Sequence, residues 1–188
     1  MMIYISCAKT MTARNRQQVP FTTIPHFEKE ARENAMNMAQ FSAKDLSSLL
    51  RINNKLAAEN VLRYHEFFSP ESHSLPALLA YTGIVFKRLN PKDFTDEDWE
   101  YTQDHLFITS FLYGLLRPLD LIKSYRLEGD VRMPEHGDAT MFEYWRSLLT
   151  DYFITEIKKQ GRVLVNLASA EMKGLFHWEK IAQAVRII

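Results

Sequence analysis

The fold of this chain is restricted most by one stretch, Leu106 to Glu128, which reads LFITSFLYGLLRPLDLIKSYRLE. It opens with an apolar run that continues to Phe111. Gly114 then supplies the backbone freedom that a turn requires. Beyond the turn, Arg117 and Asp120 stand among leucines, where a polar group must find a partner or lose free energy. We therefore expect this stretch to lie in the core, with its charged residues paired.

Arg117 and Asp120 have two interpretations. They form a structural ion pair that caps a turn, with Tyr125 in the core, or they belong to a binding site. The residues alone favour the structural interpretation, because ion-pair networks in ordinary scaffolds also place charges in buried positions.

Short apolar runs and capped helical segments alternate along the rest of the chain. Strands are predicted at Met2–Cys7, Leu78–Tyr81, Val163–Leu167 and Ala184–Ile188. Helices are predicted over His26–Phe41, from Ser42 through Leu50, over Asn53–Phe68, Gly83–Leu89, from Thr95, over Thr140–Lys159 and over Glu171–Lys180. The alternation predicts one α/β domain over residues 1–188, with a mixed β-sheet flanked by helices and an N-terminal helical hairpin.

The hairpin is predicted at the short break Ile52-Asn53-Asn54, with Arg51 and Lys55 beside it. Amide groups at a helix start can bind a phosphate, so the two cations are candidate ligand-binding residues. The alternative is an ordinary turn with solvated charges, which the residues alone favour.

Bulk properties exclude few functions. The formal net charge of the 188 residues is zero, so overall electrostatics does not direct the chain to nucleic acid or to a membrane. No apolar run approaches the ~18–20 residues that cross a bilayer, and the start lacks the features of a signal peptide. The single cysteine, Cys7, excludes an intrachain disulfide. A cytoplasmic protein is expected.

Polar residues follow several of the apolar runs, and if the strands are neighbours these residues converge on one cleft. The candidate site residues are Ser6, Lys9, Thr10, Arg117, Asp120, Tyr125, Arg126, Glu128, Asn166 and Ser169. Arginine binds phosphate through two hydrogen bonds and lysine binds it as a point charge. The set therefore predicts a site for a phosphate-bearing ligand, either a nucleic-acid backbone or a nucleotide.

Catalysis has less support. The chain has no phosphate loop, zinc signature or nucleophile elbow, and its histidines have no ligand spacing. Ser6 near Lys9 is an activated hydroxyl in principle, but a serine that bonds the backbone at a strand end is far commoner. Acidic residues between Asp93 and Asp104 fit a solvated helix start better than a metal site. We assign no catalytic residue, no metal and no cofactor.

Three segments together resemble the motifs of the YaaA family, the bacterial peroxide-stress proteins. They are Leu112-Tyr113-Gly114-Leu115-Leu116-Arg117-Pro118-Leu119-Asp120 with Tyr125-Arg126-Leu127-Glu128, then Ile5-Ser6-Cys7-Ala8-Lys9-Thr10, and Asn166-Leu167-Ala168-Ser169. The resemblance runs essentially the length of the chain. It implies protection from hydrogen peroxide, limitation of free intracellular iron, and DNA binding that involves an element like a helix-hairpin-helix. The break beside Arg51 and Lys55 is the best local candidate for that element.

The chain departs from the family pattern in three places and in its length. Cys7 stands where proline is usual, Phe111 replaces a glycine, and Met172 replaces a common aromatic residue. The family continues beyond the position where this chain ends, so a C-terminal segment is expected to be missing. If that segment supplies phosphate contacts, nucleic acid binding by residues 1–188 is expected to be weak.

Two functional classes stay open. The first is a DNA-associated protein of peroxide stress. The second is an enzyme that acts on a nucleotide or another small phosphate-bearing anion in the cleft. A steep fall of affinity with salt is typical of the first, because phosphate contacts release counterions. Turnover of a small ligand is typical of the second.

Overall fold

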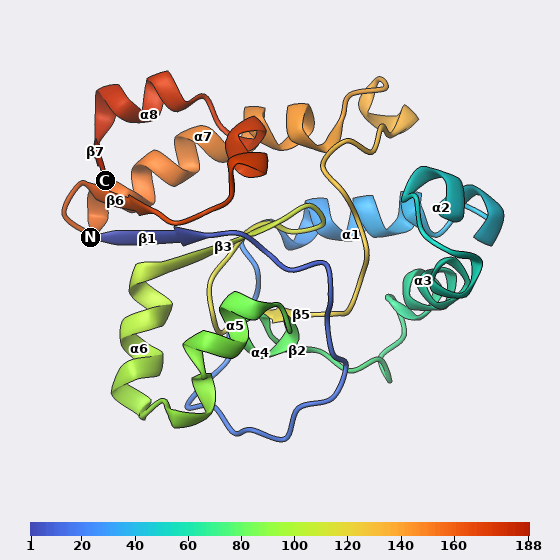
Figure 1. Ribbon diagram of the computed structural model, residues 1–188, viewed down its shortest axis with the longest axis horizontal. Coiled ribbons are helices and arrows are strands. Elements are labelled where there is room, and N and C mark those ends of the chain that lie inside the picture. Colours follow the sequence, from blue (N-terminus) through green and yellow to red (C-terminus); the bar gives the residue numbers. More distant parts are fainter.

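The computed structural model describes residues 1–188 and is built around a five-stranded sheet (Figure 1). Its strands lie in the order β4 (Gly114–Leu116), β3 (Leu106–Ser110), β1 (Met2–Ile5), β6 (Val163–Asn166) and β7 (Arg186–Ile187). β1 is parallel to β3 and β6, and β7 is parallel to β6, but β4 is antiparallel to β3. A separate antiparallel pair joins β2 (Leu75–Pro76) and β5 (Leu121–Ile122). The predicted mixed sheet is confirmed.

Helices cover the sheet on two sides. They are α1 (Glu28–Met38), α2 (Ala43–Leu49), α3 (Asn54–Glu66), α4 (Ala77–Ala80), α5 (Ile84–Leu89), η1 (Pro91–Asp93), α6 (Asp96–His105), η2 (Pro134–His136), α7 (Met141–Lys159), η3 (Ala170–Leu175) and α8 (Trp178–Ala184). In Figure 1, α7 and α8 lie on one side and α6 on the other, while α2 and α3 lie beyond the carboxyl end of β1. None of these helices combines the length and the apolar character that a membrane crossing requires.

Local capping signals place the helix starts, as predicted. Ser42 and Thr140 each form a reciprocal capping box with the acidic residue three positions later. Thr95 does the same at the start of α6. The Asn53 side chain accepts a hydrogen bond from the Leu56 amide at 2.9 Å, which starts α3 directly after α2. Each cap satisfies a backbone group that the helix cannot, a contribution of about 1 kcal/mol. The predicted helical hairpin is therefore present as α2 and α3.

The predicted strand at Leu78–Tyr81 is wrong, because the chain forms the short helix α4 there. The first amides of α4, those of Ala77 and Leu78, donate to the carbonyl oxygens of Asp120 and Pro118 at 2.9 and 3.1 Å. A run of four apolar residues has no period from which strand and helix can be distinguished, and Leu and Ala favour helix. The distant loop after β4 supplies the partners that decide the outcome.

The predicted helix over Glu171–Lys180 is divided, because Phe176 interrupts it in an extended conformation. The buried Phe176 ring packs 4.7 Å from the Phe153 ring and 5.5 Å from the Tyr4 ring, between centroids. A continuous helix would carry this ring out of that aromatic cluster. The predicted terminal strand is likewise shorter than expected, because β7 holds only two residues and Ala184 belongs to α8.

Candidate functional site

The carboxyl ends of β1 and β6 meet at one edge of the sheet, because the two strands are parallel neighbours. Ser6 follows β1, and Ser169 lies just beyond β6. The Ser169 amide donates to the Ser6 hydroxyl at 2.8 Å, and the two hydroxyl oxygens are 3.3 Å apart. Asn166, at the end of β6, accepts a hydrogen bond from the Ala168 amide at 3.1 Å and so shapes this turn. The polar residues that follow β1 and β6 therefore lie together, as predicted.

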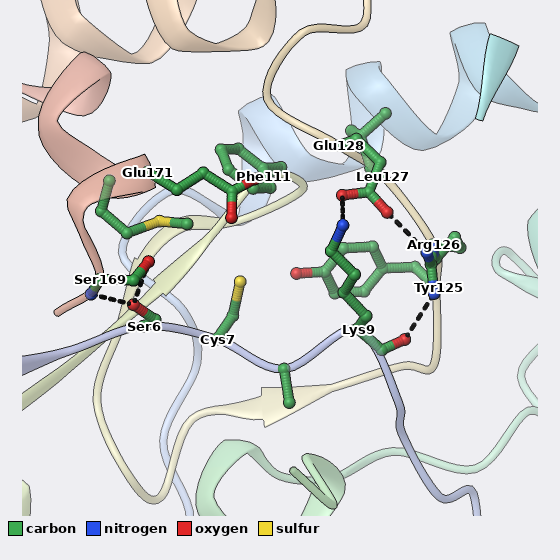
Figure 2. Close-up of a pocket in the computed structure, with 12 residues that line it drawn as sticks. Ser6, Cys7, Lys9, Phe111, Tyr125, Arg126, Leu127, Glu128, Ser169 and Glu171 are labelled. Carbon is green, nitrogen blue, oxygen red and sulfur yellow. Dashed lines mark hydrogen bonds and ion pairs between the residues drawn. The ribbon is translucent and has the colours of Figure 1, made fainter. Parts of the chain in front are cut away.

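Lys9, Arg126 and Glu128 form a connected group at the same edge, which we call the clamp (Figure 2). One carboxylate oxygen of Glu128 forms an ion pair with the Lys9 ammonium at 3.2 Å, and the other lies 2.8 Å from the Arg126 guanidinium. Arg126 also donates to the Lys9 carbonyl oxygen at 3.2 Å. The Glu128 side chain is only 12% exposed, whereas that of Lys9 is 62% exposed. The clamp thus holds a buried carboxylate beneath a cation that solutes can reach.

Three cavities meet at the clamp, and Lys9 and Arg126 line all of them. The first, which we call the inner pocket, has a volume of about 220 Å³ and includes Ser6, Cys7 and Glu171 in its walls (Figure 2). The second, of about 240 Å³, lies between the clamp and α3, and we call it the hairpin groove. The third, of about 330 Å³, is bordered by residues of the α2–α3 turn. The α2–α3 hairpin and the residues that follow β1 and β6 therefore share one region of the surface.

The cavities differ in charge. The inner pocket has two cations, Lys9 and Arg126, and two carboxylates, Glu128 and Glu171, which cancel. The charges around the third cavity also cancel, because Arg51 joins the two cations and Asp130 joins the two carboxylates. The hairpin groove is different. Its walls hold the cations Lys9, Arg63 and Arg126 and no carboxylate.

Tyr125 forms a wall of the inner pocket, but its hydroxyl is already engaged. It lies 2.8 Å from the Tyr81 hydroxyl and 2.7 Å from that of Ser110. The Tyr113 amide in turn donates to Ser110 at 2.9 Å. Burial raises the pKa of Tyr125 well above its ordinary value, so the phenol stays neutral. Its role at the site is to hold the wall in position.

Arg117 and Asp120 were predicted to share this cleft, and the structure places them elsewhere. They follow β4, which is antiparallel to β3, so its carboxyl end points to the opposite edge of the sheet. There Arg117 pairs with Glu156 at 2.6 Å and donates to the Gln103 carbonyl at 2.6 Å. Its guanidinium also lies 4.6 Å from the centre of the Phe107 ring. Arg117 thus joins α6, β3 and α7 and is absent from the candidate site.

Asp120 is buried and closes a turn, as the structural interpretation expects, but it forms no ion pair with Arg117. Its two oxygens accept hydrogen bonds from the Arg117 amide and the Thr23 hydroxyl, each at 2.7 Å. Burial raises the pKa of its carboxyl to about 6, although both hydrogen bonds act in the opposite direction. Asp120 therefore anchors the loop that contains Thr23.

Of the remaining predicted residues, Thr10 and Arg51 each line one of the three cavities and Lys55 lines none. Thr10 lines the hairpin groove and accepts a hydrogen bond from the Thr82 hydroxyl at 3.1 Å. Arg51 adopts a left-handed conformation with φ 52° and pairs with Asp130, which offsets its charge. Lys55 is exposed and lies outside the walls of the three cavities. Among the predicted residues, only Lys9, Thr10 and Arg126 therefore border the cationic groove.

The sequence did not single out Arg63 or Glu171. Arg63 lies on the face of α3 that also carries Leu56 and Asn60, and it donates to the Asn60 side chain at 3.2 Å. Helical spacing puts these three on one face, but it does not reveal which loop that face meets. Glu171 follows the Ser169 turn and points toward the same space as Cys7 in Figure 2. Its position depends on how η3 is oriented, for which the sequence carries no signal.

Cys7 lines the inner pocket as a neutral thiol. Burial raises its pKa to about 11, an effect that the nearby carboxylates of Glu128 and Glu171 strengthen and a hydrogen bond with Thr109 weakens. The thiolate, rather than the thiol, reacts with peroxide and with alkylating reagents. The structure therefore gives Cys7 little reactivity at neutral pH.

We expect Cys7 in the folded protein to react with iodoacetamide much more slowly at neutral pH than the same cysteine in urea. The native rate should rise about tenfold per pH unit as the thiolate fraction grows, up to the region of the raised pKa. Mass spectrometry of time points measures the rate, and circular dichroism confirms that the fold persists. A native rate at neutral pH equal to the rate in urea would contradict the raised pKa.

Comparisons with known proteins agree with the motifs. The sequence model of a family described as "Peroxide stress protein YaaA" matches residues 1–188. A "UPF0246 protein" of Phocaeicola vulgatus is 59% identical over the whole of this chain, which spans 74% of that relative. A "UPF0246 protein" of Bacteroides fragilis is 58% identical over the whole chain and 73% of its own length. One from Crocosphaera subtropica is 35% identical over 96% of this chain and 72% of its own length. The chain belongs to the family of the peroxide stress protein YaaA.

Proposed function

We propose that this chain protects against peroxide stress by binding DNA, with a backbone phosphate held in the hairpin groove. The observation that carries the proposal is the set of three cations, Lys9, Arg63 and Arg126, around a groove without a carboxylate. A cleft lined by one sign of charge concentrates ligands of the opposite sign, even when the net charge of the protein is zero. Arg63 offers a planar donor group that matches a phosphate, and Lys9 and Arg126 add positive charge beside it, although both also pair with Glu128 outside the groove.

The position of the hairpin gives further support. Ile52, in the turn between α2 and α3, and Leu56, in the first turn of α3, both line the groove. A phosphate there would lie near a helix start, where the helix dipole favours negative charge. The proposal therefore uses the α2–α3 hairpin together with the clamp, whereas the exposed Lys55 has no part in it.

Binding of duplex DNA across a salt series tests the proposal. Three phosphate contacts predict a slope of log affinity against log salt of about −2.7, and alanine at Lys9 or Arg63 should each reduce the magnitude by about 0.9. Lys158→Ala is the matched control, because Lys158 is an exposed cation of α7 outside all three cavities. Circular dichroism checks that each variant is folded. Salt-independent binding, or an equal effect of Lys158→Ala, would refute the phosphate site.

Limitation of free intracellular iron is part of the same proposal, as an effect in the cell that depends on the groove. The variants provide the test. Cells that carry Arg63→Ala in place of the natural protein should contain as much chelatable iron after peroxide treatment as cells without the protein. Electron paramagnetic resonance of the chelated iron measures this. A normal iron level in these cells would separate iron limitation from the groove.

A second candidate function is an enzyme that acts on a nucleotide or another small phosphate-bearing anion. The observation that favours it is that Ser6 lines the inner pocket together with the charged groups of the clamp, although the two carboxylates of that pocket oppose an anion. Turnover of a small phosphate ester that Lys9→Ala abolishes would favour this candidate. Salt-dependent DNA binding without such turnover would favour the first.

A further inference from the structure

We propose that the inner pocket receives one unpaired nucleobase that carries an exocyclic amine, from the DNA strand whose phosphate occupies the hairpin groove. This inference rests on the proposed function and names what the neighbouring cavity adds to it. Three properties of the pocket support it: its charge balance, its size and walls, and a carboxylate that forms no ion pair within the protein.

The charge balance disfavours a phosphate in the inner pocket. Lys9 and Arg126 are offset there by Glu128 and Glu171, so an anion would meet two carboxylates within the same walls. A neutral planar group with both donors and acceptors suits such a mixture, because each donor on the ligand can find an acceptor on the protein and the reverse. Nucleobases are groups of this kind.

The size and walls of the pocket suit a single ring system. Its volume of about 220 Å³ equals that of roughly seven liquid water molecules at ~30 Å³ each, which is less than a typical ligand pocket. Phe111, Leu127 and Met172 contribute apolar wall, and Cys7 adds a neutral thiol. Enzymes and binding proteins hold extruded bases between aromatic and apolar side chains in the same manner.

Glu171 supplies the recognition of the amine. The Glu128 carboxylate is held by Lys9 and Arg126, whereas Glu171 takes part in no ion pair and its carboxylate points toward the centre of the pocket (Figure 2). A carboxylate accepts hydrogen bonds from an exocyclic amine, as acidic side chains do from cytosine. Adenine, cytosine and guanine offer such an amine, and thymine does not.

The clamp explains how one strand reaches both cavities. Lys9 and Arg126 line the inner pocket on one side and the hairpin groove on the other. A nucleotide whose phosphate contacts these two cations from the groove therefore has its base next to the mouth of the inner pocket. Base pairing would have to be broken first, which is easiest at a bulge or a mismatch.

Three duplexes test the inference with the 188-residue protein. One carries a single bulged 2-aminopurine, which has an exocyclic amine; the second carries a bulged thymine; the third is fully paired. We expect the 2-aminopurine bulge to bind about tenfold more tightly than the other two, with a change in its fluorescence. Glu171→Met should remove this preference for the 2-aminopurine bulge, and Ser169→Phe should remove it too, because the larger side chain fills the pocket. Lys158→Ala should keep the preference.

The outcomes separate the two proposals. Salt-dependent binding with equal affinity for the three duplexes overturns the base pocket and leaves the phosphate groove standing. Failure to bind any duplex overturns both. Displacement of the bulged duplex by an equal concentration of free guanosine monophosphate overturns the strand-borne base, because the pocket would then recognise a free nucleotide.

Discussion

Replacement of Arg117 by methionine is expected to destabilise the fold by about 2–4 kcal/mol without selective loss of DNA binding by the folded protein. The guanidinium holds Glu156, whose side chain is 11% exposed, at 2.6 Å. Burial favours the neutral form of Glu156, but contacts from Lys159 and Arg117 outweigh it and lower the pKa of the carboxyl. Without Arg117, this buried carboxylate keeps only the exposed Lys159 as a partner. Urea unfolding followed by circular dichroism measures the loss.

Two further variants isolate the cause. Lys159→Met removes the exposed partner of Glu156 and should cost less than about 1 kcal/mol, as exposed ion pairs do. In the double variant Arg117→Met with Glu156→Gln, part of the lost stability should return, because the unpaired charge is gone. If Arg117→Met instead left stability unchanged and abolished DNA binding, Arg117 would be a site residue and the structural assignment would be wrong.

The residues of one motif have two different roles in this protein. Within the Leu106–Glu128 stretch, Arg117 and Asp120 serve the fold, whereas the segment Tyr125–Glu128 supplies two members of the clamp. Arg117 and Arg126 look alike in the sequence, since each is a cation among apolar residues. They differ because β4 runs antiparallel to β3, which carries Arg117 to the opposite edge of the sheet.

Features set by neighbouring residues were predictable from the sequence. The caps at Ser42, Asn53, Thr95 and Thr140 all lie where expected, because a cap involves only three or four consecutive residues. The polar loop after β1 was predictable too, because it depends only on a buried strand that is followed directly by polar residues. Ser6 and Lys9 accordingly line the inner pocket.

Features set by distant partners were not predictable. The run at Leu78–Tyr81 becomes a helix because carbonyl groups of the Pro118–Asp120 loop accept its amides. Arg63 reaches the site because α3 lies against the loop after β1, about fifty residues earlier in the chain, a contact that no local pattern encodes. The charge of each cavity follows from these placements. Nothing in a neutral overall composition predicts a groove with three cations and no carboxylate.

Alanine at Gly114 is expected to destabilise the protein by about 2–5 kcal/mol, a large share of the roughly 5–15 kcal/mol that holds a domain folded. Gly114 has φ +74°, a region that residues with a side chain avoid. A Cβ atom there would also lie 2.7 Å from the Trp145 ring and 2.9 Å from Leu149, both fully buried. Trp145 cannot easily move, because its indole N–H donates to the Phe111 carbonyl at 2.8 Å.

Gly137→Ala separates the two contributions to this loss. Gly137 has a similar φ of +64°, but nothing lies within 4 Å of its added Cβ. This variant therefore measures only the cost of placing alanine in a left-handed backbone conformation, about 1–2 kcal/mol. Urea unfolding of both variants gives the comparison, and the difference between them measures the overlap with Trp145 and Leu149. Equal losses in the two variants would contradict the packing argument. A greater loss at Gly114 would mean that the turn before Leu115 holds β4 against α7. The family motif would then preserve the sheet on which the clamp is built.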